Sequence, residues 1–311
     1  MFSQTSLSAL LAAVTLLSPA KAIPAPLARR DISADVLAKL YLAHQYSAAA
    51  YCPNNNDNSS SKLTCPTGNC DIVQADNTSV LTEFQNLGLA DSTGYVALDH
   101  TRSKIILAYR GTESIQNFLA DASFPLVPAP DICASCHAES GFYSFWRASK
   151  PAILAALDQA RAQHPSYSLD VIGHSLGAAA ATLAAAHVRN TGSHADLYSF
   201  SSPRVGDPAF ARYVGGQDGV SGSNYRVTHR DDWVPKAPLK AMGYLHVADE
   251  YWISSPNGVN VTTSDVVVFE GYEGEDYDGG NAGTEKTDPT FQTHEWIFDK
   301  ITLCYPKGTI E

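Results

Sequence analysis

A single serine stands between two glycines in the stretch Gly173-His174-Ser175-Leu176-Gly177, and this pattern can create a nucleophile. Gly-x-Ser-x-Gly places a hydroxyl on a sharp turn when it follows a buried strand and opens a helix. Residues 168–172 (SLDVI) predict such a strand, and residues 176–188 (LGAAAATLAAAHV) predict the helix. A purely structural turn is the alternative interpretation. The context favours a reactive Ser175 at the carboxyl end of a strand, near the positive end of the helix dipole.

A serine nucleophile also needs a histidine base and an acid that orients this base. In folds that present serine on such a turn, the residues follow the chain order Ser, Asp or Glu, His. Asp231 and Asp232 are the acid candidates, because they lie just after the predicted strand 225–228. Only His246 and His294 follow these acids. His246 lies in a Tyr- and Trp-rich stretch that is typical of a packed, hydrogen-bonded histidine, whereas His294 ends a long loop, where a base can be held in place.

The first 30 residues predict targeting and processing segments rather than part of the fold. Residues 7–17 are mostly apolar and are followed by Ala20-Lys21-Ala22, which fits a signal-peptidase site. We therefore expect a signal peptide over residues 1–22, and a propeptide over residues 23–30 that ends at Arg29-Arg30. No later apolar run reaches the ~18 residues that a membrane span needs. The expected product is a secreted, extracellular, soluble domain over residues 31–311.

Acidic residues outnumber basic ones, and this excludes several kinds of partner. The formal net charge is −11, from 21 Lys and Arg against 32 Asp and Glu. Removal of residues 1–30 takes away three basic residues and no acidic one, so the expected mature charge is −14. Nucleic-acid binding requires a basic surface, and anionic membranes attract basic segments. We therefore expect no nucleic-acid partner and no docking on anionic membranes. We also expect a monomer.

Six cysteines, an even number, are typical of a protein from an oxidising compartment. Fifteen pairings are possible in principle. Proximity along the chain favours one of them, in which the disulfides are Cys65–Cys70, Cys133–Cys136 and Cys52–Cys304. The Cys-x-x-Cys pair has no second Cys or His pair at metal spacing, so a disulfide is favoured over a zinc site. Three Asn-x-Ser/Thr sequons predict surface glycosylation, at Asn58, Asn77 and Asn260.

Strand and helix patterns alternate along the chain and predict an α/β fold. Strands are expected at 95–98, 105–109, 169–172, 197–200, 225–228 and 266–269. Helical patterns are expected at 31–50, 142–163 and 176–188. Such alternation is typical of a mostly parallel or mixed sheet that is covered on both faces, here in one domain. The acidic, Gly-rich run 270–288 lacks the spaced ligands of a calcium loop, and we interpret it as a solvated loop.

Several long motifs, in the same order, resemble the secreted filamentous-fungal lipases of class 3 and the feruloyl esterases related to them. They are QYSAAAYC (45–52), YRGTESIQNF (109–118), DICASC (131–136), GHSLGAA (173–179), SSPRVGDPAF (201–210), YRVTHRDDWVPKAP (225–238) and GYLHVADEYWI (243–253), with the closing His and Cys. The resemblance covers essentially the whole expected mature chain. It implies an α/β-hydrolase fold with a short helical lid, and an ester hydrolase activity.

The resemblance also implies roles for individual residues. The family's acid lies in Thr-His-x-x-Asp-x-Val-Pro, which matches Asp232, with Asp231 where relatives often have Asn. Its final histidine matches His294, so the implied triad is Ser175, Asp232 and His294. The backbone N–H of Leu176, just after the nucleophile, is one expected oxyanion donor. The resemblance implies Thr112 as the other donor, and it implies the same disulfide pairing.

The expected reaction forms and then hydrolyses an acyl-enzyme, and it requires no metal and no cofactor. In this mechanism the serine attacks the ester carbonyl, and the histidine acts first as base and then as acid.

The segment after Thr112 corresponds to the lid of these lipases, with Ser114, Ile115, Gln116, Asn117, Phe118 and Leu119 as its residues. One helical face carries its apolar side chains, Ile115, Phe118, Leu119 and Ala122. Such a helix can cover an apolar cleft in water and lie on a lipid surface when open. A permanently packed surface helix is the alternative. Phe118 stands where many relatives have Trp. The apolar face of the helix favours long-chain acyl substrates over the aromatic esters that feruloyl esterases hydrolyse.

The expected function is therefore hydrolysis of tri-, di- or monoacylglycerol esters at a lipid–water interface. The motifs GHSLGAA and EYWISSPN resemble members that act on mono- and diacylglycerols. A feruloyl-type esterase or a phospholipase is the alternative within the hydrolases. A catalytically inactive lipid-binding protein is the alternative outside them, and the complete triad argues against it.

Overall fold

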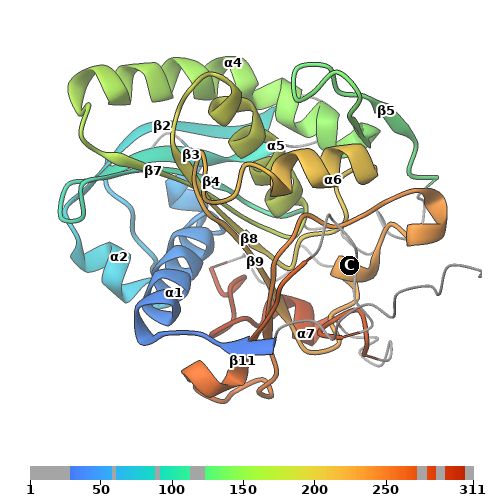
Figure 1. Ribbon diagram of the computed structural model, residues 1–311. Coiled ribbons are helices and arrows are strands. Elements are labelled where there is room, and N and C mark those ends of the chain that lie inside the picture. The colour runs from blue at the N-terminus through green and yellow to red at the C-terminus, as the bar shows by residue number, and fades with distance from the viewer. Residues whose placement is uncertain are drawn as a thin grey trace, which may run out of the picture.

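A mixed β-sheet forms the centre of the molecule, with helices on both of its faces (Figure 1). The computed structural model describes residues 29–57, 61–87, 92–112, 123–271, 279–284 and 291–304. Within these residues the sheet has nine strands in the order β1-β11-β10-β9-β8-β7-β4-β3-β2. Their bounds are β1 (Arg29–Asp31), β2 (Thr78–Leu87), β3 (Ser92–Asp99), β4 (Lys104–Tyr109), β7 (Ser168–His174), β8 (Ala195–Phe200), β9 (Asn224–His229), β10 (Glu250–Ile253) and β11 (Val266–Phe269).

The central strands β4, β7, β8, β9 and β10 run parallel to one another. Antiparallel pairing adds β3 and β2 at one edge of the sheet, and β11 and β1 at the other. The carboxyl ends of neighbouring parallel strands all lie on the same side of the sheet, and ligands of open α/β sheets bind next to these strand ends. Ser175, which follows β7, and Asp232, which follows β9, therefore both lie at these carboxyl ends.

Helix α1 (Ala34–Ala49) packs on one face of the sheet, while α4 (Ser140–Gln163), α5 (Leu176–Asn190) and α6 (Pro208–Gly215) lie on the other (Figure 1). The shorter elements are α2 (Asp71–Ala75), α7 (Gln292–Glu295), the 3-10 turns η1 (Pro53–Asn55), η2 (Val234–Lys236), η3 (Lys240–Met242) and η4 (Thr263–Asp265), and a small sheet of β5 (Leu126–Pro128) and β6 (His137–Glu139). In the part of the chain that the structure describes, no helix is long and apolar enough to cross a membrane.

Alternating side chains explain how both faces of the sheet are buried. In β3, Val96 and Leu98 join the core beneath α4 and α5, whereas Tyr95 and Ala97 join the core beneath α1. Successive side chains of a strand point to opposite faces, so a sheet that is covered on both sides needs apolar residues at both sets of positions. Helix α5 is buried along most of its length, and its alanine side chains allow it to lie close to the sheet.

The predicted α/β-hydrolase architecture is confirmed, and each predicted strand lies within a strand of the structure. Strands β2 and β10 are not predicted from the sequence. β2 is an edge strand with several half-buried side chains, and β10 has only four residues, so neither carries a strong pattern.

The dibasic pair Arg29-Arg30, at the end of the expected propeptide, contributes to the sheet of the full-length chain. It belongs to β1 and pairs with Phe269 and Val268 of β11. Arg30 Nε also donates to Glu270 Oε1 at 2.6 Å. Main-chain pairing at a sheet edge does not depend on apolar side chains, so a charged dipeptide can extend the sheet.

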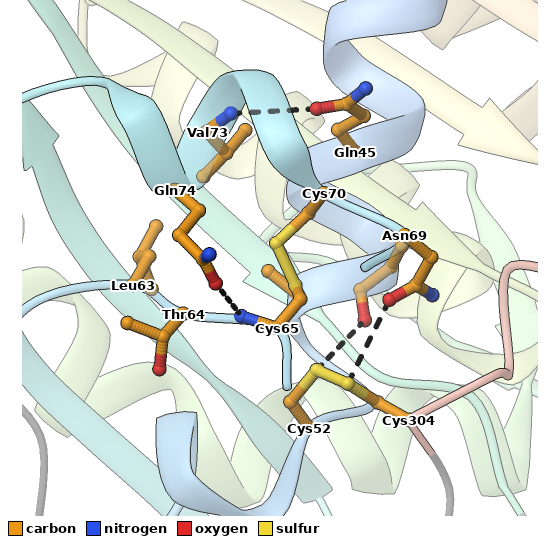
Figure 2. The surroundings of a disulfide bond; sticks show 12 residues. Gln45, Cys52, Leu63, Thr64, Cys65, Asn69, Cys70, Val73, Gln74 and Cys304 are labelled. Carbon is orange, nitrogen blue, oxygen red and sulfur yellow. Dashed lines mark hydrogen bonds between the residues drawn. A yellow bond between two sulfur atoms is a disulfide. The ribbon is translucent and has the colours of Figure 1, made fainter. Parts of the chain in front are cut away.

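The three predicted disulfides, Cys52–Cys304, Cys65–Cys70 and Cys133–Cys136, are present. Figure 2 shows the first two side by side beneath α1 and α2. Nearby, Gln45 Oε1 accepts hydrogen bonds from the backbone N–H groups of Ile72 and Val73, which joins α1 to α2. The Cys52–Cys304 bond attaches the C-terminal segment, which follows α7, to the end of the first helix.

Candidate active site

Ser175 lies on the sharp turn between β7 and α5, in a backbone conformation that few residues adopt. Its φ is 59° and its ψ is −129°. A Cβ at Gly173 would lie 2.2 Å from Gly177 O, and a Cβ at Gly177 would lie 2.5 Å from Arg110 O. Both glycines are therefore sterically required. Strained backbone of this kind persists where the surrounding structure holds it, and it gathers at functional sites.

His294, in α7, contacts the carboxylate of Asp232, in the turn after β9. His294 Nδ1 lies 3.0 Å from Asp232 Oδ2 and 3.1 Å from Oδ1. Both side chains are almost fully buried, with 4% and 0% of their surfaces exposed. The backbone N–H of Val234 donates to Asp232 Oδ1 at 3.0 Å, which fixes the carboxylate. The structure thus pairs His294 with Asp232 rather than with Asp231, as the resemblance implied.

His246, the other histidine considered as a base, lies elsewhere. Its side chain is 6% exposed, and its Nε2 lies 2.7 Å from the main-chain oxygen of Pro235. It is therefore a packed, hydrogen-bonded histidine, as predicted.

The reactive atoms of the candidate nucleophile and base have no hydrogen-bond partner among the described residues. These atoms are Ser175 Oγ and His294 Nε2, and both are buried. When Nδ1 of a neutral histidine carries the proton and donates it to a carboxylate, Nε2 keeps its lone pair and can accept a proton. The ring of His174, the residue before Ser175, lies 4.6 Å from the ring of His294, between centroids. The base and the nucleophile therefore occupy the same small region.

The expected oxyanion donors flank the serine. Leu176 is the first residue of α5, and the first N–H groups of a helix have no partner within it. Thr112 follows Gly111 in the chain. A Cβ added to Gly111 would lie only 2.9 Å from Ser175 Cβ. The loop after β4 therefore passes directly beside Ser175, and the half-buried Thr112 is one residue further on.

A buried chain of hydrogen bonds beneath the site is not predicted from the sequence. Gly111 N–H donates to Tyr51 Oη at 3.1 Å, and Tyr51 Oη lies 2.6 Å from His174 Nδ1. His174 Nε2 lies 2.9 Å from the main-chain oxygen of His294. These partners are consistent with a Tyr51 hydroxyl that donates to Nδ1, and with a His174 that carries its proton on Nε2. Burial, together with His294, lowers the pKa of His174 well below its usual range, so this ring is neutral.

Some predicted residues lie outside the described residues. These are the lid positions Ser114, Ile115, Gln116, Asn117, Phe118 and Leu119, and the sequon residue Asn58. The other two sequon asparagines, Asn77 and Asn260, are exposed, so both are accessible to glycosylation.

Known proteins share this fold and these motifs. Residues 106–242 match the family model "Lipase (class 3)". The secreted mono- and diacylglycerol lipase A of Penicillium cyclopium is 43% identical over 283 residues, which cover 90% of each chain. This chain belongs to the class 3 lipase family. The crystal structure of a mono- and diacylglycerol lipase from Aspergillus oryzae superposes with a TM-score of 0.81 and 39% identity, over 86% of this chain and 98% of that one.

A second solved structure, of lower sequence identity, bears on the site. A triacylglycerol lipase whose catalytic centre is described as a serine-protease triad superposes with a TM-score of 0.77 and 27% identity, over 89% of this chain and 100% of that one. The match to the family model begins within β4 and includes the serine turn and the Asp232 turn, but it ends before His294.

Proposed function

We propose that this chain is a secreted lipase that hydrolyses acylglycerol esters and prefers mono- and diacylglycerols to triacylglycerols. One observation carries the proposal: Ser175 stands on a strained turn beside a buried Asp232–His294 pair whose carboxylate–Nδ1 distance is 3.0 Å. The substrate class follows the names of the relatives, which include mono- and diacylglycerol lipases.

In the proposed mechanism, Ser175 Oγ attacks the ester carbonyl and forms a bond to its carbon. His294 Nε2 takes the serine proton and then gives it to the departing glyceride oxygen as the ester bond breaks. Water then attacks the acyl-enzyme, transfers its proton to His294, and releases the fatty acid. Asp232 holds Nδ1–H and stabilises the charged imidazolium in both halves.

The backbone N–H groups of Leu176 and Thr112 are proposed to stabilise the oxyanion. Negative charge develops on the carbonyl oxygen in each tetrahedral state, and preorganised N–H donors in a water-poor site stabilise it. Loss of one such donor typically costs about 2.7–4 kcal/mol of transition-state stabilisation.

The test compares hydrolysis of emulsified diolein, emulsified triolein and dissolved methyl ferulate by the wild-type chain and by Ser175→Ala. We expect diolein to be the better glyceride, and we expect Ser175→Ala to lose at least about a thousandfold in rate. Ser193→Ala, a half-buried serine in the turn after α5, is the matched control and should retain full activity. Activity on methyl ferulate alone would indicate a feruloyl-type esterase. Full activity of Ser175→Ala would refute the assigned nucleophile.

The lipid–water interface is the proposed partner, and exposed apolar side chains that follow Asp232 in the chain support it. Trp233, Leu239 and Met242 are 38%, 49% and 40% exposed, and all three follow Asp232 within ten residues. We name them the apolar rim. Arg204 Nη1 donates to the main-chain oxygens of Lys236 and Pro238, so buried contacts hold the loop of the rim. With its acidic charge, the chain suits an uncharged glyceride surface rather than an anionic membrane.

The rim is tested with the double variant Leu239→Ser and Met242→Ser, which leaves Trp233 beside the acid unchanged. The variant should bind diolein emulsions more weakly and hydrolyse them more slowly, but it should hydrolyse dissolved p-nitrophenyl butyrate at the wild-type rate. Val220→Ser is the matched control. Val220 is 77% exposed and precedes β9, so it lies toward the amino ends of the parallel strands, away from the carboxyl ends that carry Ser175 and Asp232. Equal losses on both substrates would show that the rim does not bind the interface.

Signal-peptide removal after residue 22 and cleavage after Arg30 remain our proposals for maturation. They predict that the N-terminal sequence of the secreted protein begins at Asp31. Any other start would move the proposed boundary.

A further inference from the structure

A short part of the acidic loop, residues 279–284, packs against the turn that carries Asp232. Asn281 is only 2% exposed, although the surrounding run is rich in acidic residues and glycine. Its Nδ2 donates to the main-chain oxygen of Asp232 at 2.9 Å and to that of Arg230 at 3.1 Å. One amide group therefore contacts both ends of the three-residue turn after β9.

The same segment is also hydrogen-bonded to the sheet, through Glu250 of β10. Asn281 N–H donates to Glu250 Oε1 at 3.3 Å, and the Thr228 hydroxyl donates to the same oxygen at 2.5 Å. Arg226 Nη1 lies 3.7 Å from this oxygen. Gly280, with φ +56°, allows the close approach, because a Cβ there would lie 2.2 Å from Glu250 Oε2. The buried Glu250 thus connects the segment to β9 and β10.

A second contact holds the far end of the segment. Lys236 Nζ donates to both the main-chain oxygen and the hydroxyl of Thr284, at 2.8 Å each. The Thr284 hydroxyl in turn donates to Asn281 O at 2.7 Å. The segment therefore contacts the chain on both sides of Val234, whose N–H donates to the Asp232 carboxylate.

The Asp232 turn needs such support, because its own backbone is strained. Arg230 has φ 40°, in the left-handed region that non-glycine residues rarely adopt. Residues held in such conformations keep them only when the surrounding structure imposes them. The Trp252 indole also donates to Arg230 O, at 3.0 Å, whereas Asn281 contacts the main chain of both Arg230 and Asp232.

We propose that Asn281 is a positioning residue for the acid Asp232. The inference rests on the proposed function, in which the Asp232 carboxylate orients His294. Asn281 contacts the Asp232 main chain rather than its carboxylate, and it acts through the placement of the turn. Without the amide, the turn relaxes and the carboxylate–Nδ1 contact of 3.0 Å weakens. The imidazolium that forms during reaction is then less stabilised.

The test measures kcat, KM and the pH profile of kcat/KM for Asn281→Ala on dissolved p-nitrophenyl butyrate. We expect kcat to fall about ten- to a hundredfold, because the turn loses one or two buried hydrogen bonds to its main chain. KM should stay near the wild-type value. The acid limb of the profile should move to lower pH, because a carboxylate that is held less closely stabilises the protonated base less than in the wild type.

Thr284→Val is the matched control, since it perturbs the same segment but leaves the Asn281–Asp232 contact. It should change thermal stability without moving the acid limb. If Asn281→Ala does not fold, Asn281→Ser is measured in its place, because it also removes the paired amide donor. A folded Asn281 variant with a wild-type kcat and acid limb overturns the inference, as does an equal kcat loss in Thr284→Val. Neither result affects the nucleophile, which the Ser175→Ala experiment tests separately.

Discussion

His174 Nε2 lies 2.9 Å from the main-chain oxygen of His294, although the two residues are 120 positions apart in the sequence. This contact joins the strand that ends at the serine turn to the short helix that carries the candidate base. Through Tyr51, the same ring is connected to Gly111, beside the expected oxyanion loop. Parts of the site that come from distant segments are therefore linked beneath the reacting atoms.

Removal of the Tyr51 hydroxyl should lower both stability and activity. Tyr51→Phe leaves Gly111 N–H and His174 Nδ1 without their buried partner, and each such group costs about 1–3 kcal/mol. We expect a lower free energy of unfolding, and a kcat about tenfold lower on dissolved p-nitrophenyl butyrate. Tyr213→Phe is the control, because the Tyr213 hydroxyl donates to Asn190 at the exposed surface. Indistinguishable effects of the two variants would argue against the proposed coupling.

A methyl group at Gly173 should disrupt the serine turn. In Gly173→Ala the new Cβ meets backbone atoms of Gly177, which cannot rotate away as a side chain can. We expect a loss of about 1–3 kcal/mol in the free energy of unfolding, with most of the activity lost. Gly215→Ala is the control, because no atom lies within 4 Å of a Cβ at that position. Denaturant unfolding and ester hydrolysis of both variants test this, and a fully active Gly173→Ala would contradict the steric argument.

The buried carboxyl of Asp170 should make stability depend on pH. Burial raises its pKa from 3.8 to about 6, despite contacts with Lys104 Nζ at 2.6 and 2.8 Å. Between about pH 4 and 6 the folded chain holds a proton that the unfolded chain has released. Folding is therefore favoured by about 1.4 kcal/mol for each unit that the pH falls in this window.

Asp170→Asn removes this contribution. From pH 6.5 to pH 4.5, the wild-type chain should gain up to about 2 kcal/mol in free energy of unfolding relative to the variant. Urea denaturation at the two pH values measures the difference. A change of opposite sign would show that the ion pair with Lys104 outweighs burial.

The disulfides should contribute unequally to stability. Cys52–Cys304 closes a loop with a sequence separation of 252 residues, whereas Cys133–Cys136 closes one of 3. In the chain-entropy model the long loop is worth about 5.5 kcal/mol and the short one about 2 kcal/mol. We expect the double Ala variant of Cys52 and Cys304 to lose more Tm than that of Cys133 and Cys136. Similar losses in a thermal unfolding experiment would contradict the entropic account.

Much of the architecture could be predicted from local patterns. The strand, the serine turn and the alanine-rich helix over residues 168–188 are adjacent in sequence, and their geometry depends on local sterics such as the two glycines. The disulfides also follow from proximity, because two pairs are local and the third is what remains. Strands β2 and β10 could not be predicted, because a half-buried edge strand and a four-residue strand carry little periodicity.

The sequence by itself therefore determined the serine turn, the order of the candidate triad and the family resemblance. Only the tertiary structure decided which side chains meet: His294 with Asp232, His174 with the main chain of His294, and Asn281 with the Asp232 turn. These contacts join segments that are dozens of residues apart in the sequence. They form because the parallel strands of the sheet have their carboxyl ends on the same side. No local pattern gives Tyr51 or Asn281 a role, because the role of each depends on a partner that folding alone brings near.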